Sequence, residues 1–87
     1  MKKLTQDVFK GAPEWVRSAA VDAKGEAWGY SVKANQLFVE VFTDGNGLNP
    51  YLDFCTTQID RLKITLLQKC YDPTDWQNSA IDSEVQP

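Results

Sequence analysis

Two cysteines and twelve acidic residues are the side chains with the best prospect of doing chemistry here, and the chain contains no histidine. Cys55 and Cys70 lack the histidine base that normally activates a thiol nucleophile, although a helix start or a nearby lysine can also do so. Asp72 and Asp75 have the spacing of a capped helix start, which accounts for both carboxylates without catalysis. We therefore predict that the protein is not an enzyme.

Metal and cofactor sites are not predicted either. The spacing of the two cysteines fits no zinc or redox motif, and the sequence holds no glycine-rich phosphate loop. Asp44 opens an Asp-Gly-Asn-Gly stretch that is similar to the start of a calcium loop, but residues 48–51 do not supply the later acidic ligands. A turn explains this stretch better. We expect no metal ion and no cofactor.

The charge of the chain argues against direct binding of nucleic acid. The formal net charge is −3, and binding phosphates requires neutralising cations. Trp28 and Tyr30 could stack on bases, but single-strand binders pair such aromatics with a basic groove, so core packing explains them better. No basic residue follows Lys69, and the acidic residues beyond it form either a docking surface or a solvated tail with a charged helix start; they are Asp72, Asp75, Asp82 and Glu84.

Contact with another protein is the function that remains. The chain has ten aromatic residues of the types that are enriched at interface cores, and a small domain has little core in which to hide them. Four of them flank the loop at 44–50 and are candidates for an exposed patch, although a thin core could also use them. The predicted partner-binding residues are Phe38, Phe42, Asp44, Tyr51, Phe54, Asp72 and Asp75.

The length of 87 residues allows one domain, which we place at 1–82 with a frayed tail at 83–87. Polar residues at 5–7 follow the first lysines, where a signal peptide would be apolar, and no apolar run has membrane-spanning length. We expect a cytoplasmic protein that does not bind membranes. Both thiols should be reduced and buried in the core.

A hairpin is the clearest local prediction. Residues 19–21 and 26–32 form its strands, and Asp22 and Gly25 suit the first and fourth positions of a type I turn. Trp28, Tyr30 and Val32 share one face of the second strand. The opposite face carries Ala27, Gly29 and Ser31, so another element, such as a helix, should pack closely there.

The remaining predicted elements lie on either side of this hairpin. We predict a helix over 6–10, capped by Thr5 and ended by Gly11, a third strand over 37–43, and a helix over 73–81, capped by Asp72. Pro50 keeps any strand near it at an edge. Within 56–69 both a helix and a strand over 62–67 fit, and the β-branched residues favour the strand.

Together these elements predict an α+β fold. It has a small antiparallel sheet of three or four strands, with short N- and C-terminal helices packed on one face. Trp15, Trp28 and Trp76 should share its core.

Two segments resemble small accessory proteins of phages and prophages. Residues 19–30, AAVDAKGEAWGY, resemble a hairpin of such proteins, and residues 72–81, DPTDWQNSAI, resemble their C-terminal box. The stretch 8–15 is similar in style to their first helix. The resemblance covers about half of the chain, excludes 37–58 and carries no catalytic residue.

This resemblance implies a bacterial host and a setting rather than an activity. Acidic proteins of this kind include inhibitors of host defence, anti-CRISPR proteins among them, which occupy a surface on a host protein complex. The function implied is non-catalytic binding, with inhibition of a host defence complex as its specific form. The first alternative is a homodimeric structural or virion-assembly accessory protein. The second is a small enzyme or regulator that uses an unusual carboxylate or thiol site.

Overall fold

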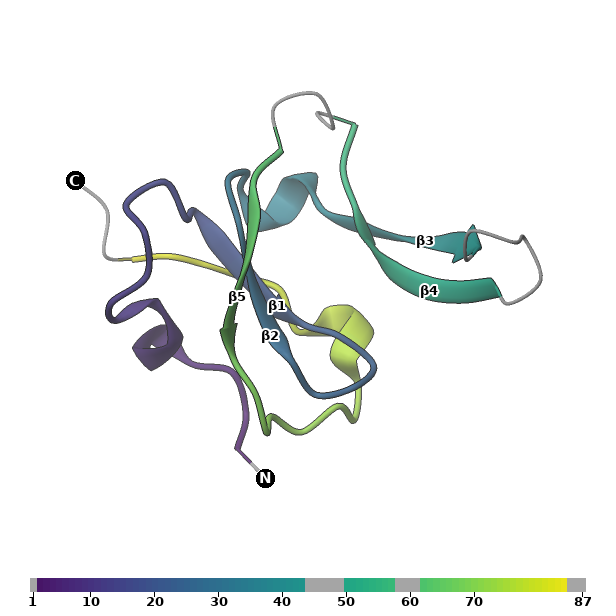
Figure 1. The fold of residues 1–87 in the computed structure, drawn as a ribbon, viewed down its shortest axis with the longest axis horizontal. Coiled ribbons are helices and arrows are strands. Elements are labelled where there is room, and N and C mark those ends of the chain that lie inside the picture. Colours follow the sequence, from purple (N-terminus) through teal and green to yellow (C-terminus); the bar gives the residue numbers. More distant parts are fainter. Residues whose placement is uncertain (1, 44–49, 58–61, 85–87) are drawn as a thin grey trace.

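The computed structural model describes residues 2–43, 50–57 and 62–84, which form two antiparallel sheets (Figure 1). A four-stranded sheet has the order β5-β2-β1-β6, with β1 at Ser18–Val21, β2 at Ala27–Tyr30, β5 at Ile64–Gln68 and β6 at Ile81–Asp82. The other sheet is a ribbon of β3 (Phe38–Thr43) and β4 (Pro50–Cys55) that extends away from the body. The expected antiparallel character is confirmed, but the predicted third strand belongs to this separate ribbon.

The β1–β2 hairpin forms as its turn residues predict. The Gly25 N–H donates to the Asp22 carbonyl oxygen at 3.0 Å, and Gly25 takes a φ of +82°. The Asp22 carboxylate also accepts hydrogen bonds from the backbone N–H groups of Lys24 and Glu26, through Oδ1, at 2.9 and 3.0 Å. These contacts hold the turn in one conformation, so the position of the Asp22 side chain is fixed.

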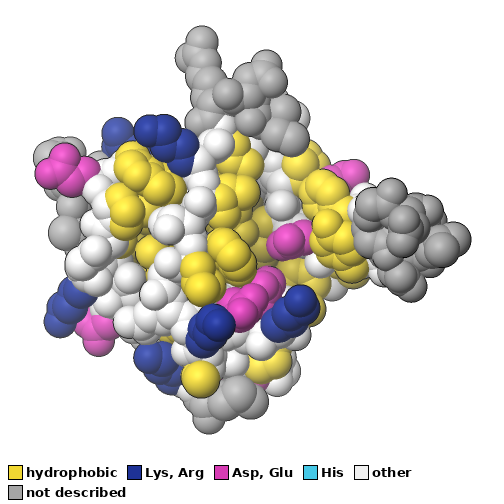
Figure 2. All heavy atoms as spheres, viewed as in Figure 1, with side chains coloured by type: hydrophobic (Ala, Val, Ile, Leu, Met, Phe, Trp, Pro, Cys, Tyr) yellow, Lys and Arg dark blue, Asp and Glu magenta, His cyan; other side chains and the backbone are white. Residues whose placement is uncertain are grey.

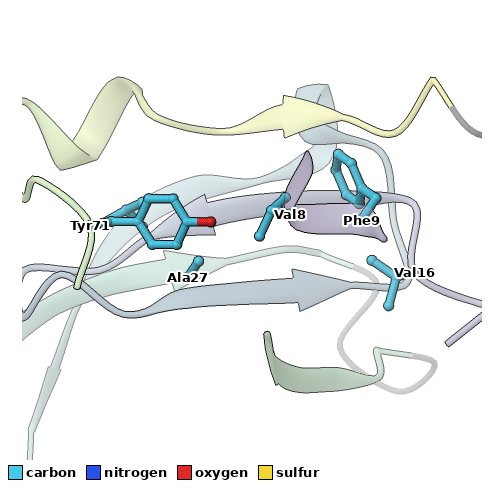
Figure 3. Close-up of a cluster of buried hydrophobic side chains, with 7 residues drawn as sticks. Val8, Phe9, Val16, Ala27 and Tyr71 are labelled. Carbon is cyan, nitrogen blue, oxygen red and sulfur yellow. The ribbon is translucent and has the colours of Figure 1, made fainter. Parts of the chain in front are cut away.

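One face of the four-stranded sheet carries the first of two buried clusters (Figure 3). Ala27 lies in this cluster beside Val8, Phe9 and Val16 from the N-terminal segment, and Tyr71 closes it. A Cβ added to Gly29 would lie 2.9 Å from Val16 Cγ1, which shows how closely that segment approaches the sheet. The small residues on this face therefore have the role that their alternation predicted.

The opposite face carries the second cluster, which attaches the β3–β4 ribbon to the sheet. Tyr30 and Val32 from the sheet side are buried there with Phe54 from β4. The Phe54 ring lies 6.3 Å from the Tyr30 ring and 5.6 Å from the Trp76 ring, both in edge-to-face arrangements. Phe54 is thus the main buried link between the ribbon and the body.

The three tryptophans do not share one core, so that prediction is wrong. Trp15 packs against the first cluster as part of the N-terminal segment, and Trp28 packs against the second because its side chain points to the opposite face of the sheet from Ala27. Trp76 packs against both clusters. All three side chains are only half-buried.

The predicted terminal helices form short 3₁₀ turns instead. The turn η1 spans Gln6–Phe9, without a side-chain cap from Thr5, and η4 spans only Trp76–Asn78. A third turn, η2, spans Ala34–Gln36. Segments this short cannot repay helix nucleation, and Ile81 pairs with Ala19 in the sheet, which stops a helix over 73–81. Among the described residues no helix is long and apolar enough to cross a membrane.

The segment 56–69, for which the sequence fits both a helix and a strand, contains the strand β5. β5 pairs with β2, and Leu66 and Ile64 lie opposite Trp28 and Tyr30. Side chains that face each other across an antiparallel pair lie on the same side of the sheet. Leu66 and Ile64 therefore lie on the face that also holds the ribbon, and the helix alternative is wrong for the described part of 56–69.

The cysteines do not occupy the buried positions that we expected. Both are free, Cys55 is half-buried in β4, and Cys70 is exposed. Cys70 takes a φ of 71°, and the next residue, Tyr71, enters the core in its place.

Candidate partner-binding surface

Large apolar side chains are exposed on three strands. Among the described residues, six such side chains are between 39 and 64% exposed, and all lie on β3, β4 or β5. They are Phe38, Val41, Tyr51, Leu52, Ile64 and Leu66. Scattered exposed apolar residues are ordinary, but a concentration on neighbouring elements marks an interaction site. We call these six residues the apolar surface.

The apolar surface has one part on the β3–β4 ribbon and another on β5, and Trp28 is a neighbour of both parts. It lies opposite Leu66 in the sheet, and it also lines a hollow together with Tyr51 and Leu52 of β4. Figure 2 shows apolar side chains over β5 and along the ribbon on the same side of the molecule, with acidic side chains between them. The register of the ribbon places Val41 and Leu52 on one of its faces and Phe38 and Tyr51 on the other, so the apolar surface extends over both faces of the ribbon beside the hollow.

The hollow has a volume of about 230 Å³ and lies between the β1–β2 turn and β4. The turn side contributes Asp22, Ala23, Lys24, Glu26 and Trp28, and the β4 side contributes Tyr51, Leu52 and Asp53. The Trp28 indole N–H donates to Asp22 Oδ2 at 3.0 Å, so the fixed turn also holds the ring in place. The hollow thus joins two aromatic rings to three carboxylates and one lysine.

The surroundings of Asp53 in the hollow disfavour its ionised form. Burial raises the pKa of the Asp53 carboxyl, and the negative charge of Asp22 raises it further, against the opposing effects of the Phe54 N–H and Lys24. Burial also raises the pKa of the Tyr30 hydroxyl, with smaller contributions from Asp53 and Asp22. Burial is the larger cause of both pKa shifts, and the neighbouring negative charges add to it.

Replacing Asp53 by asparagine should stabilise the protein at pH 7. Because the pKa of Asp53 is raised by folding, the stability that this group contributes is present below its unfolded pKa of about 3.9 and is lost as pH rises through the folded value. Asp53→Asn keeps the oxygen that accepts the Phe54 N–H and removes the charge. We expect a gain of up to about 1 kcal/mol at pH 7 that disappears near pH 3.

Thermal unfolding of both proteins at the two pH values measures this effect. Glu40→Gln is a matched control, because Glu40 lies opposite Asp53 in the ribbon, is exposed and carries the same charge. It should change stability less than Asp53→Asn does. A variant Asp53→Asn that is less stable than the parent at pH 7 would contradict the electrostatic explanation.

The predicted partner-binding residues do not lie together on one surface of the structure. Phe38 and Tyr51 belong to the apolar surface, and Phe42 is half-buried with its ring stacked 5.7 Å from the Tyr51 ring. Phe54 is only 7% exposed, so the prediction that it belongs to an exposed patch is wrong. Its side chain packs in the second cluster and anchors the ribbon to the sheet. Asp44 lies outside the described residues.

Asp72 and Asp75 lie in a different hollow, of about 260 Å³, with Lys3 and Asn78. The Asp72 carboxylate accepts a hydrogen bond from the Thr74 N–H at 2.9 Å, and this bond lowers its pKa. Asp75 is exposed and takes a left-handed φ of 61° at the start of η4. Both aspartates therefore shape a turn, and neither lines the hollow beside the apolar surface.

Sequence reasoning missed several residues of this region. Trp28 was assigned to the core and Asp22 to a turn, and each has that role, but both also line the hollow. Asp53 carried no signal, because only the fold of the ribbon brings it towards Asp22. Leu66 and Ile64 followed from the alternation in β5, although not as exposed residues.

Comparison of the chain with protein-family models, curated proteins and solved structures finds no match. No residue role is transferred to this site from another protein. The resemblance to phage accessory proteins stays a prediction.

Proposed function

We propose that the protein is a non-catalytic protein-binding module that contacts its partner through the apolar surface. The observation that supports this function is the concentration of exposed large apolar side chains on β3, β4 and β5. Covering such a surface removes apolar area from water, which is the main favourable term in most protein association. The tyrosine among these residues is of a type that is enriched at interface cores.

The setting that we propose is a phage or prophage accessory protein acting in the cytoplasm of a bacterial host. Support comes from the two segments that resemble such proteins, 19–30 and 72–81, and from the net charge of −3. In this setting the partner is a host protein complex, and inhibition of host defence by occupying a surface is the specific form of the function.

Self-association is the second candidate function, and the sheet topology favours it. β5 lies at one edge of the four-stranded sheet, and within the described residues β3 and β4 pair only with each other. Exposed strand edges offer unpaired N–H and C=O groups that another copy can pair with. A homodimeric structural or virion-assembly accessory protein would use the same elements.

Affinity capture from a bacterial lysate tests the proposed function. Val41→Ser/Leu52→Ser removes two apolar side chains that face each other across the ribbon, one 64% and the other 42% exposed. The parent protein should enrich one host complex, and this variant should bind the purified complex about tenfold more weakly or worse. Glu14→Ser/Gln77→Ser introduces the same residues at exposed positions outside the surface and should bind like the parent.

Circular dichroism confirms that each variant is folded before the comparison. Equal capture by all three proteins would refute the apolar surface as the binding site. Sedimentation equilibrium separates the second candidate: a dimer that Val41→Ser/Leu52→Ser dissociates, without any captured complex, would support self-association instead.

A further inference from the structure

The hollow beside the apolar surface has a composition that defines what it can bind. Its lining combines the aromatic residues Trp28 and Tyr51 with three carboxylates and one lysine, so its formal charge is negative. Aromatic faces attract cations through their quadrupole, and carboxylates attract them through charge. Both features point to a positively charged group.

The carboxylates of the hollow are not equally available to a ligand. Asp22 uses Oδ1 for two backbone N–H groups and Oδ2 for the Trp28 indole. Glu26 lies 3.9 Å from the Lys69 ammonium. Asp53 accepts the Phe54 N–H through Oδ1, and among the described residues no hydrogen bond to its Oδ2 is formed. Asp53 therefore keeps one oxygen with capacity to pair with a cation and, unlike Glu26, forms no ion pair among the described residues.

The volume of the hollow and the chemistry of its lining indicate which type of cation it can bind. The volume of about 230 Å³ is below the 300–1,000 Å³ of typical small-molecule sites, so a single side chain suits it better. Among the described residues no group of three or more histidine, cysteine, aspartate or glutamate side chains could hold a metal ion. A guanidinium group can stack on an aromatic ring and also form hydrogen bonds to a carboxylate, which suits this lining better than an ammonium does.

We propose that the hollow receives an arginine side chain of the partner protein, which stacks against Trp28 or Tyr51 and pairs with Asp53. Apolar residues beside that arginine then cover Leu52 and Leu66, which flank Trp28 on its two sides. The partner surface is thus basic and apolar. This inference rests on the proposed protein-binding function and specifies its chemistry.

Titration with a defined peptide tests the inference directly. The probe is a blocked pentapeptide with a central arginine between apolar residues, and the matched probe has citrulline, which is neutral, in its place. The readout is the indole N–H signal of Trp28 in ¹⁵N-labelled protein, because that group donates to Asp22 within the hollow. The indole signals of Trp15 and Trp76 serve as internal references, because neither residue lines this hollow.

The arginine peptide should shift the Trp28 signal in a saturable way, and the citrulline peptide should bind about tenfold more weakly. Asp53→Asn should weaken binding of the arginine peptide about threefold or more. Asp75→Asn is the matched control, because Asp75 is exposed in the other hollow and its left-handed conformation accepts asparagine. This variant should retain the parent affinity.

Three results would overturn the inference. A Trp28 signal that stays unchanged with the arginine peptide shows that the hollow does not take the side chain. Equal affinity for arginine and citrulline removes the electrostatic recognition. A Trp28 signal that moves on dilution without peptide assigns the hollow to a second copy of the chain. In the first two cases, loss of lysate capture by Val41→Ser/Leu52→Ser would still support the proposed function.

Discussion

Phe54→Ala should lower the free energy of unfolding by about 3–5 kcal/mol, as truncation of a buried phenylalanine does. The side chain is 7% exposed and contacts the rings of Tyr30 and Trp76. Its removal leaves a cavity between the ribbon and the sheet, so the attachment of the ribbon should weaken along with overall stability. Urea unfolding followed by tryptophan fluorescence measures the change.

Phe42→Ala is the matched control for this experiment. Phe42 lies on the other strand of the ribbon, is half-buried and stacks on Tyr51, so its removal should cost only about 1 kcal/mol. If Phe54→Ala does not fold, Phe54→Leu measures the same contact with a smaller loss. Equal costs for Phe54→Ala and Phe42→Ala would mean that Phe54 does not anchor the ribbon.

Gly25→Ala should destabilise the protein by at least about 2 kcal/mol, because two effects act together. The φ of +82° is unfavourable for a residue with a Cβ, and that Cβ would lie 2.6 Å from the carbonyl oxygen of Tyr71. The oxygen belongs to the backbone, and the Tyr71 N–H donates to the Gly25 carbonyl oxygen at 2.9 Å. The clash can therefore be relieved only by separating the turn from this segment.

Gly11→Ala isolates the conformational part of that cost. Gly11 has a φ of +76°, but a Cβ there would meet no atom within 4 Å. Its substitution should cost about 1–2 kcal/mol, and thermal unfolding of both variants gives the difference. A cost for Gly25→Ala no larger than that for Gly11→Ala would show that the contact with Tyr71 does not constrain the turn.

Local signals in the sequence were sufficient where turn chemistry and strand alternation agreed. Asp22 and Gly25 predicted the β1–β2 turn, and the β-branched residues at 64 and 65 favoured the strand that β5 forms. The terminal helices were mispredicted because their capping residues also suit turns. Pairing of Ile81 with Ala19, far away in sequence, decided between the two outcomes at the C-terminal end.

The candidate site was less predictable because it depends on how the ribbon docks. Aromatic residues around 44–50 indicated the ribbon as a contact surface, and Phe38 and Tyr51 are indeed exposed there. Phe54 has the same residue type as Phe38 but faces the core, and which face of the ribbon is covered depends on how the ribbon docks on the sheet. The approach of Asp53 to Asp22 requires the tertiary fold, so no spacing in the sequence could reveal it.

The position of Trp76 against both clusters has a consequence for how the two faces of the sheet respond to each other. Each cluster alone is small for a stable core, and a side chain common to both makes them lose order together. A protein bound to the ribbon would therefore also restrict opening of the first cluster, on the opposite face of the sheet, although the bound protein does not contact that face. Tight association at one surface then protects the part of the protein packed around the two clusters from proteolysis, because cleavage there requires opening of the folded state.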